Sequence, residues 1–293
     1  MVYLIDASVY VFRAYYSLPP DMRDPDGNPV HALYGFGRFL GDLLERARPE
    51  YVAVAFDASL ATSFRNRIYP AYKANRDPAP PDLELQFERC RELCAHLGVS
   101  WFASTEYEAD DIIGTLATRV RTEGLRCTLV TKDKDMAQLV REGDVYWDYS
   151  SNTRYYYRDI AERFGVEPER YADYLALTGD AVDNIPGVPG VGPKTAAVLM
   201  RAFSSLEALY DGLDRIADLP MRGAGTLAAR LATHREAAFL ARQLTLIHCA
   251  MPLDVGRHHL RRRGPDGERF DAFCERQNFG SLLRRQAARL ALP

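Results

Sequence analysis

The stretch "YVAVAFD" at residues 51–57 is nearly continuous in apolar residues until it ends at an acid, Asp57. Two other runs have the same form. "VYLID" at 2–6 ends at Asp6, and "RCTLVTKDKD" at 126–135 ends at Asp133 and Asp135. Strands that are buried on both faces of a parallel sheet have this composition. The runs therefore predict three buried strands that each end in a carboxylate.

Helical patterns separate these runs, at roughly 30–48, 84–97 and 109–122. Alternating strands and helices predict an α/β fold with a mostly parallel, doubly wound sheet that is flanked by helices. Ligands of such sheets bind at the carboxyl ends of the strands. We therefore expect the acids that end the three strands to lie close together there.

The third helix begins with four acids in "EYEADD", residues 106–111. Acids at a helix start are commonly explained by the partial positive charge of the free N–H groups. Crowded carboxylates also indicate a metal ion between them. Because this helix directly precedes the third acidic strand, its acids are placed to meet the others. Oxygen ligands of this kind favour Mg²⁺ or Mn²⁺ over zinc.

A segment rich in glycine and proline, "LTGDAVDNIPGVPGVGPKTAAVL", spans residues 177–199. Asp180 and Asp183 are three residues apart and would face the same way on a helical turn. The loop that follows ends at an expected helix start near Lys194. Glycines allow close backbone approach, and the N–H groups of a helix start bind anions. A nucleic-acid phosphate is the natural anion here, and a plain turn between helices is the alternative.

The composition permits one large core, or one domain with a smaller second one: the chain has 293 residues, 47% of them hydrophobic. The sequence contains no apolar run long enough to span a membrane, and its five cysteines are scattered. We therefore expect a cytoplasmic protein with reduced cysteines. Only four of the 37 basic residues are lysines, and all four fall within the motifs: Lys73, Lys132, Lys134 and Lys194.

Four segments together resemble the signatures of the 5′-nuclease family. They are "SFRNRIYPAYKANR" at 63–76, "YEADD" at 107–111, "TKDKDMAQLV" at 131–140 and "LTGDAVDNIPGVPGVGPKTA" at 177–196. The family includes the 5′–3′ exonuclease domain of bacterial DNA polymerase I, phage flap endonucleases and stand-alone bacterial exonucleases. The similarity extends from Asp6 to "FGSLLRR" near residue 285, and the order of the motifs makes it specific.

The resemblance implies a PIN-like nuclease core at 1–165, with a helical arch at about 58–90, and a helical DNA-binding region with a helix–hairpin–helix motif at 166–293. It assigns nine metal ligands: Asp6, Asp57, Glu108, Asp110, Asp111, Asp133, Asp135, Asp180 and Asp183. Glu106 lies outside the motif and is expected only to cap its helix. Setting these nine aside leaves 31 of the 40 acids against 37 bases, a balance of +6 over the rest of the chain.

The activity implied is that of a structure-specific 5′–3′ exonuclease and 5′-flap endonuclease. Two or more Mg²⁺ (or Mn²⁺) ions would support DNA hydrolysis, leaving a 5′-phosphate and a 3′-hydroxyl. Lys73 and Arg76 are the expected catalytic cations. Expected DNA contacts are Arg65, Tyr72, Lys73, Arg76, Gly187, Gly190, Gly192, Lys194 and Thr195, with Tyr72 stacking on an unpaired base. Hairpin carbonyls at Gly187, Val188, Gly190 and Val191 are the expected potassium site.

The expected partners are DNA flaps, gaps and ends, with RNA–DNA primers as an open alternative, and we expect a monomer. Lys132 departs from the small residue that close relatives carry there, and its role stays open: it contacts phosphate or points away. We interpret the chain as a stand-alone enzyme, with a fragment as the alternative. The rivals are a PIN-type ribonuclease and a non-catalytic DNA-binding protein. Ser8 excludes phosphatases that need Asp-x-Asp after the first strand.

Overall fold

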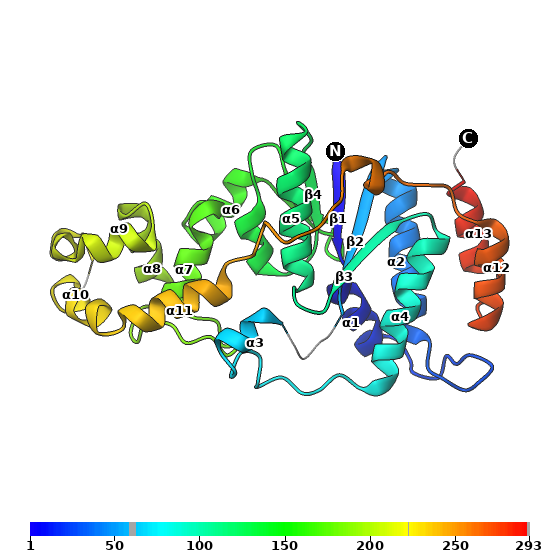
Figure 1. Cartoon of the computed structure of the whole chain (residues 1–293), viewed down its shortest axis with the longest axis horizontal. Helices are drawn as coiled ribbons and strands as arrows, with labels where there is room; N and C mark the ends of the chain where they lie inside the picture. Colours follow the sequence, from blue (N-terminus) through cyan, green and yellow to red (C-terminus); the bar gives the residue numbers. More distant parts are fainter. Residues whose placement is uncertain (59–62, 222, 292–293) are drawn as a thin grey trace.

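A six-stranded sheet lies at the centre of the molecule in the computed structural model, which describes residues 1–58, 63–221 and 223–291 (Figure 1). The strand order is β3-β2-β1-β4-β5-β6, and β6 pairs antiparallel with β5 while the other pairs are parallel. The strands are β1 (Val2–Asp6), β2 (Tyr51–Asp57), β3 (Ser100–Ser104), β4 (Cys127–Val130), β5 (Val145–Asp148) and β6 (Thr153–Tyr155). The predicted strands are β1, β2 and β4, and they are adjacent.

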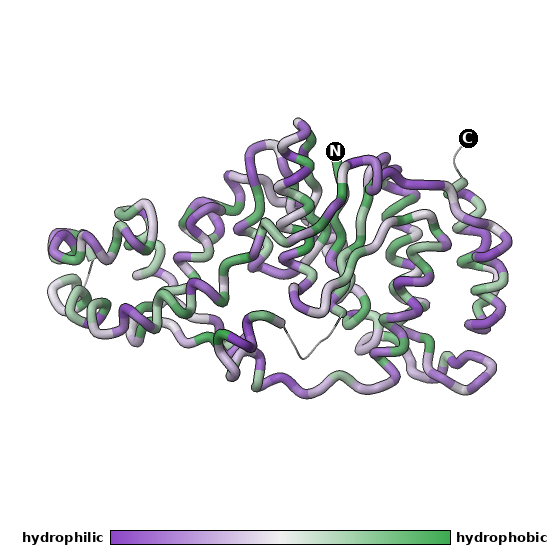
Figure 2. Tube along the Cα trace, viewed as in Figure 1, coloured by the Kyte–Doolittle hydropathy of each residue, from purple (hydrophilic) through white to green (hydrophobic). Residues whose placement is uncertain are grey.

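Both faces of these strands are buried, which explains their continuous apolar sequence. Side chains alternate between faces along a strand. Ile5, Val54 and Phe56 therefore pack into one core with the helices α1 (Ala7–Ser17) and α2 (His31–Ala47), while Leu4 and Ala55 pack into a second core with α5 (Ala109–Thr122). In Figure 2 the strands are mostly coloured as hydrophobic, whereas hydrophilic residues are frequent on the outer helices.

Three of the four core helices lie close to the predicted ranges, and α5 matches its prediction at both ends, whereas the helix at residues 7–17 was not predicted. The four are α1 (Ala7–Ser17), α2 (His31–Ala47), α4 (Pro81–His96) and α5 (Ala109–Thr122). None of the helices within the described ranges is long and apolar enough to cross a membrane.

The second half of the chain is helical and extends to one side of the sheet (Figure 1). Its helices are α6 (Tyr157–Phe164), α7 (Tyr171–Thr178), α8 (Pro193–Ala202), α9 (Leu206–Asp211), α10 (Ala224–Thr233) and α11 (Arg235–Thr245). The last two helices, α12 (Gly267–Arg276) and α13 (Ser281–Arg289), return to the opposite end and pack on α4 and α2. The chain also contains short 3₁₀ helices: η1 (Lys134–Leu139), η2 (Pro168–Arg170), η3 (Leu213–Asp218) and η4 (Arg257–Leu260). The division at 165/166 stays a prediction, but part of the predicted second region packs on the first.

Within the described residues, the expected helical arch is helical only near its two ends, in α3 (Phe64–Ile68) and in the first turns of α4, and is irregular between them. The irregular chain continues from the end of α3 until α4 begins at Pro81. Residues 59–62 of the predicted arch lie outside the described residues. Pro70, Pro78 and Pro80 remove backbone donors and disfavour helix before them, which accounts for the irregular path. The segment crosses the end of the sheet at which β1 and β2 finish (Figure 1).

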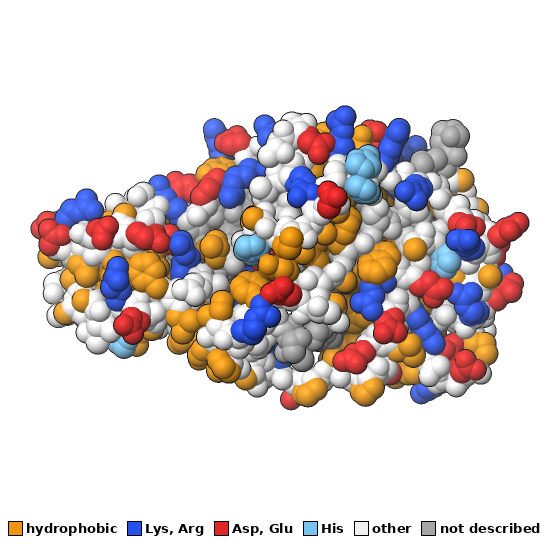
Figure 3. Space-filling view, in the orientation of Figure 1, with side chains coloured by type: hydrophobic (Ala, Val, Ile, Leu, Met, Phe, Trp, Pro, Cys, Tyr) orange, Lys and Arg blue, Asp and Glu red, His pale blue; other side chains and the backbone are white. Residues whose placement is uncertain are grey.

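Basic and acidic side chains are interspersed over the face of the molecule seen in Figure 3. The net basic balance expected outside the acidic motifs is therefore not gathered into a single patch on that face.

Candidate active site

A cavity of about 920 Å³ lies at the carboxyl ends of the central strands, beneath the arch segment. Seven of the nine predicted ligands line it: Asp6, Asp57, Glu108, Asp110, Asp133, Asp135 and Asp183. They come from β1, β2, the start of α5, the turn after β4, and the loop after α7. Parallel strands place their ends at one edge, so acids that are far apart in sequence converge here.

Hydroxyl groups hold the first two carboxylates in place. Thr131 Oγ1 donates to Asp6 Oδ2 at 2.9 Å, and Ser8 Oγ donates to Asp57 Oδ2 at 2.6 Å. Backbone N–H groups complete the support, because Ala109 N donates to the other oxygen of Asp57 at 2.9 Å. From the sequence, Ser8 served only to exclude a phosphatase, and no role was predicted for Thr131. Their positions directly beside the acidic ends of the strands were the feature of the sequence that could have indicated this supporting role.

Burial and mutual repulsion make the cluster electrostatically unfavourable on its own. Burial, then Asp57 and Asp133, raise the pKa of Asp6 to about 7. Burial and then Asp133 raise the pKa of Asp135 to about 7. The pKa of Asp110 is also raised, by burial and then by Asp133 and Asp6. These carboxylates therefore lack enough positive charge among their neighbours.

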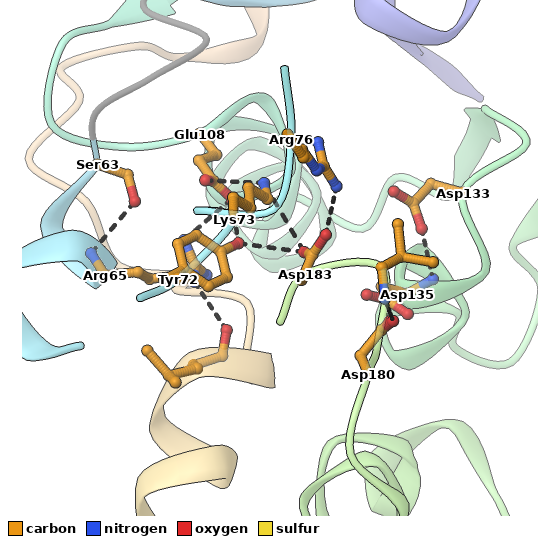
Figure 4. Close-up of polar contacts among 12 residues, drawn as sticks. Ser63, Arg65, Tyr72, Lys73, Arg76, Glu108, Asp133, Asp135, Asp180 and Asp183 are labelled. Carbon is orange, nitrogen blue, oxygen red and sulfur yellow. Dashed lines mark hydrogen bonds and ion pairs between the residues drawn. The ribbon is translucent and has the colours of Figure 1, made fainter. Parts of the chain in front are cut away.

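Two cations of the arch, Lys73 and Arg76, lie beside the carboxylates (Figure 4). Lys73 Nζ donates to Glu108 Oε1 at 2.9 Å and lies 3.8 Å from Asp183 Oδ2, and Arg76 pairs with Asp183. Burial opposes ionisation of Glu108, but Lys73 and Arg65 outweigh it and lower its pKa. The same contacts raise the pKa of Lys73 well above its usual value against the effect of burial. The predicted catalytic cations thus contact the acidic cluster directly.

Tyr72 differs from its prediction as a base-stacking residue. Its side chain is buried, and its hydroxyl donates to Glu108 at 3.0 Å and lies 3.3 Å from Asp183 Oδ2. A ring with only 4% exposure offers no face to a base in this arrangement. Its apolar body joins the core that contains α5, which explains the burial.

Asp111 and Arg65 also depart from their predicted roles. Asp111 is fully buried, and its two oxygens accept from Arg65 at 2.7 and 2.8 Å and from His248 N at 2.8 Å. The guanidinium of Arg65 also donates hydrogen bonds to the backbone carbonyls of Leu244 and Leu246. Successive helical residues point in directions about 100° apart, so Asp110 faces the cavity while Asp111 faces the interior. In this structure Asp111 therefore does not reach the cavity, and Arg65 is not free to contact phosphate.

Asp180 lies beside the cluster but does not line the cavity. Lys134 Nζ donates to it at 2.5 Å and lies 3.6 Å from Asp135 Oδ1. Lys134 was noted in the sequence as one of four lysines but was given no role. It pairs with Asp180, which like Asp111 is not among the residues that line the cavity.

The donor set fits divalent cations of the hard, oxygen-binding kind. Asp135 Oδ1 is buried without a hydrogen-bond partner, and the pKa values of Asp6 and Asp110 are raised by burial and then by neighbouring carboxylates. Within the described ranges no three of these acids yet converge on a single point. Lys73, Arg76 and Lys134 occupy the positions between them, so cation binding requires those side chains to move.

The glycine-rich loop between α7 and α8 is shaped by backbone contacts. A Cβ on Gly187 would lie 2.4 Å from the carbonyl carbon of Thr178, whereas Gly192 has open space at that position. Gly190 has φ +77° and faces Arg230 of α10. Lys194 is exposed in the first turn of α8, next to Thr195. The loop therefore joins the cavity through Asp183 to an exposed helix start, and its DNA and potassium contacts stay predictions.

Residues 1–165 match the family described as 5′–3′ exonuclease, N-terminal resolvase-like domain, and residues 166–268 match 5′–3′ exonuclease, C-terminal SAM fold. The chain belongs to the 5′–3′ exonuclease family. The predicted family resemblance is thus confirmed.

Relatives in this family include both long and short proteins. The chain is 36% identical to DNA polymerase I of Rhizobium leguminosarum over 98% of its own length, but it spans only 28% of that protein. It is 33% identical to a 5′–3′ exonuclease of Buchnera aphidicola from Acyrthosiphon pisum, over 87% of this chain and 88% of that protein.

Solved structures confirm the predicted fold. T5 5′-exonuclease with bound zinc aligns over 99% of this chain and 97% of its own, with a TM-score of 0.68 and 20% identity. Human GEN1 in complex with Holliday junction DNA aligns over 99% of this chain and 71% of its own, with a TM-score of 0.65 and 15% identity. The fold of nearly the whole chain is therefore shared with these two structures.

Proposed function

We propose that this chain is a structure-specific 5′ nuclease that hydrolyses DNA phosphodiesters with divalent metal ions and leaves a 5′-phosphate and a 3′-hydroxyl. One observation carries the proposal: seven acids from five segments line one cavity, and the arch cations lie across it. Membership of the 5′–3′ exonuclease family supports the same reaction.

The cavity acids are the proposed holders of two or more Mg²⁺ or Mn²⁺ ions. Bound divalent ions supply a hydroxide nucleophile near neutral pH and offset charge on the scissile phosphate. Asp6 and Asp57 are already aimed by Thr131 and Ser8, so these two carboxylates need the least rearrangement. We keep Asp111 out of the ligand set, because both of its oxygens are occupied.

Lys73 and Arg76 have a second proposed role once the acids hold cations. Released from Glu108 and Asp183, their charged groups remain at the mouth of the same cavity and can contact a phosphate. A fixed cation beside a phosphate that gains charge stabilises the transition state more than the ground state. Lys73 and Arg76 would then leave their carboxylate partners and bind the phosphate as the substrate enters the cavity.

The helix–hairpin–helix loop is proposed to grip the DNA backbone at Gly187, Gly190, Gly192, Lys194 and Thr195. Such contacts carry no sequence information, so recognition would depend on DNA structure: 5′ flaps, gaps or ends. A potassium ion on the carbonyls of the same loop, use of RNA–DNA primers, a monomeric state and a bacterial cytosolic location are further parts of this proposal.

The test is cleavage of a 5′-labelled flap duplex by the wild-type protein with Mg²⁺, with EDTA, and by Asp110→Asn. Asp254→Asn is the matched control, because Asp254 is exposed and does not line the cavity. We expect cuts near the flap junction that need Mg²⁺, persist in Asp254→Asn and disappear in Asp110→Asn. Flap binding without any cutting by the wild-type protein would overturn the proposal and favour a non-catalytic DNA-binding protein.

A further inference from the structure

A second cleft, of about 130 Å³, lies on the other side of the acidic turn after β4. Along this turn Asp133 and Asp135 line the large cavity, whereas Lys132 and Lys134 line the second cleft. The hydroxyl of Tyr146 donates to the carbonyl oxygen of Asp133 at 3.0 Å and fastens the turn in place. The turn therefore separates an acidic cavity from a basic cleft.

The charge of this cleft is positive and partly uncompensated. Lys132 is exposed, and no carboxylate of the described residues pairs with it. Arg163, from α6, is oriented by the hydroxyl of Tyr155 at 2.5 Å and lies over its ring at 4.9 Å. Lys134 is already neutralised by Asp180. Lys132 and Arg163 are therefore the two cations available to an anion.

One carboxylate, Asp148, also lines the cleft. Its Oδ1 accepts from Ser150 Oγ at 2.6 Å and from the backbone N–H of Ser150 and Ser151. These donors satisfy its charge locally and hold it toward its own turn. It therefore opposes an incoming anion less than an unpaired carboxylate would.

We propose that this basic cleft, through Lys132 and Arg163, binds a backbone phosphate of the same DNA whose scissile phosphate enters the acidic cavity. This inference rests on the proposed function. Neighbouring residues are about 3.8 Å apart along the chain, and neighbouring phosphates follow one another closely along a strand. One strand can therefore meet both sides of the turn. The cleft has room for a phosphate group with hydrating water, since a water needs about 10–15 Å³ of such a cavity.

The first test is the salt dependence of flap-duplex binding in EDTA, from 50 to 200 mM salt, by fluorescence anisotropy. Losing one phosphate contact lowers the slope of log Kd against log salt by about 0.7–0.9. The slope for Lys132→Ala should be lower than the wild-type slope by this amount. The rise in Kd between 50 and 200 mM salt should then be about threefold smaller for Lys132→Ala than for the wild-type protein. Lys132→Arg should keep the wild-type slope. Arg285→Ala, an exposed charge on α13 at the far end of the molecule, is the matched control.

The second test locates the phosphate. Single neutral methylphosphonates are scanned through both strands of the duplex, and Kd is measured for the wild-type protein and for Lys132→Ala. At one position the methylphosphonate should raise the Kd of the wild-type protein but leave the Kd of Lys132→Ala unchanged. The reason is that the two changes remove the same contact, so their effects are not additive.

Equal salt slopes for Lys132→Ala and Arg285→Ala, or no position with such coupling, would overturn this inference while flap cleavage still stood. Failure of the wild-type protein to bind or cut flap DNA would overturn the proposed function as well.

Discussion

Arg65 and Arg67 lie two residues apart on α3, and each pairs with a carboxylate at the start of α5. The two pairs differ in how far their side chains are exposed to solvent. The side chains of Arg65 and Asp111 are 3% and 0% exposed, while those of Arg67 and Glu106 are 68% and 48% exposed. Removing one partner of a buried pair leaves an uncompensated charge, whereas an exposed pair is screened by water. Local sequence does not distinguish these two arginines.

We expect Asp111→Ala to lower the free energy of unfolding by about 3–5 kcal/mol, because Arg65 would stay buried without its partner. Arg67→Ala, the matched control, should cost less than about 1 kcal/mol. Urea unfolding followed by circular dichroism measures both. Unchanged stability in Asp111→Ala together with weakened Mn²⁺ binding would instead return Asp111 to the ligand set.

The raised pKa values of Asp6 and Asp135 predict how stability depends on pH without metal. Both carboxyls have a pKa of about 7 in the folded protein, against about 4 in an unfolded chain. Between these values the folded protein binds more protons, so its stability falls as pH rises from about 4 to 7 and then levels off. Urea midpoints in EDTA at pH 5 to 8 should decline more steeply for the wild-type protein than for Asp6→Asn/Asp135→Asn. Parallel declines would contradict the raised pKa values.

The arch segment and the glycine-rich loop are joined as elements around the site. Lys73 N donates to the carbonyl of Asp183 at 3.0 Å, and Asn184 Nδ2 donates to the carbonyl of Ala71 at 2.7 Å. Lys73 and Asn184 both have a left-handed backbone, with φ of 56°. The arch therefore depends on the shape of the loop, and the loop depends on glycines that permit close backbone approach.

Gly187→Ala should disturb this loop, because its Cβ would lie 2.4 Å from the carbonyl carbon of Thr178. Overpacking of this kind costs about 1–3 kcal/mol, so we expect a lower melting temperature and weaker duplex binding. Gly280→Ala provides the control, since that site is open, has φ −70° and lies at the start of α13, outside the loop. Thermal melts and anisotropy with duplex DNA measure the two effects. Equal behaviour of the two variants would show that the close contact at Gly187 relaxes freely.

At the scale of the whole molecule, the cavity joins the sheet to the helical half of the chain. Asp6 and Asp57 end strands, whereas Asp183 belongs to the loop that leads to α8. Ions held between them would tie the two halves together and remove the repulsion within the cluster. Binding to the folded state alone raises stability by mass action.

Mg²⁺ at 100 times its dissociation constant should therefore stabilise the protein by about 2.7 kcal/mol. For a chain of 293 residues that corresponds to a rise in Tm of roughly 4 °C. Differential scanning fluorimetry with Mg²⁺ and with EDTA measures the rise, and Asp6→Asn/Asp57→Asn should abolish it. An undiminished rise in that variant would place the stabilising ion elsewhere.

The amino-acid sequence by itself determined the sheet at the centre of the protein and the acids at its edge. The apolar runs that end in Asp6, Asp57 and Asp133 can be recognised as strands from local sequence alone, because a strand that is buried on both faces is apolar at nearly every position. Local sequence also identifies α5, whose periodicity fixes both ends. Strands β5 and β6 have mixed polar and aromatic sequences, so no comparable pattern identified them.

The tertiary structure alone decided which charged groups face the cavity. Asp110 and Asp111 are adjacent acids, yet only Asp110 lines it, since Arg65 and the carbonyls of Leu244 and Leu246 form an interior site for Asp111. Those carbonyls lie about 180 residues from Arg65 in sequence. A charge buried against partners so distant leaves no local signal, because its environment exists only after the chain has folded.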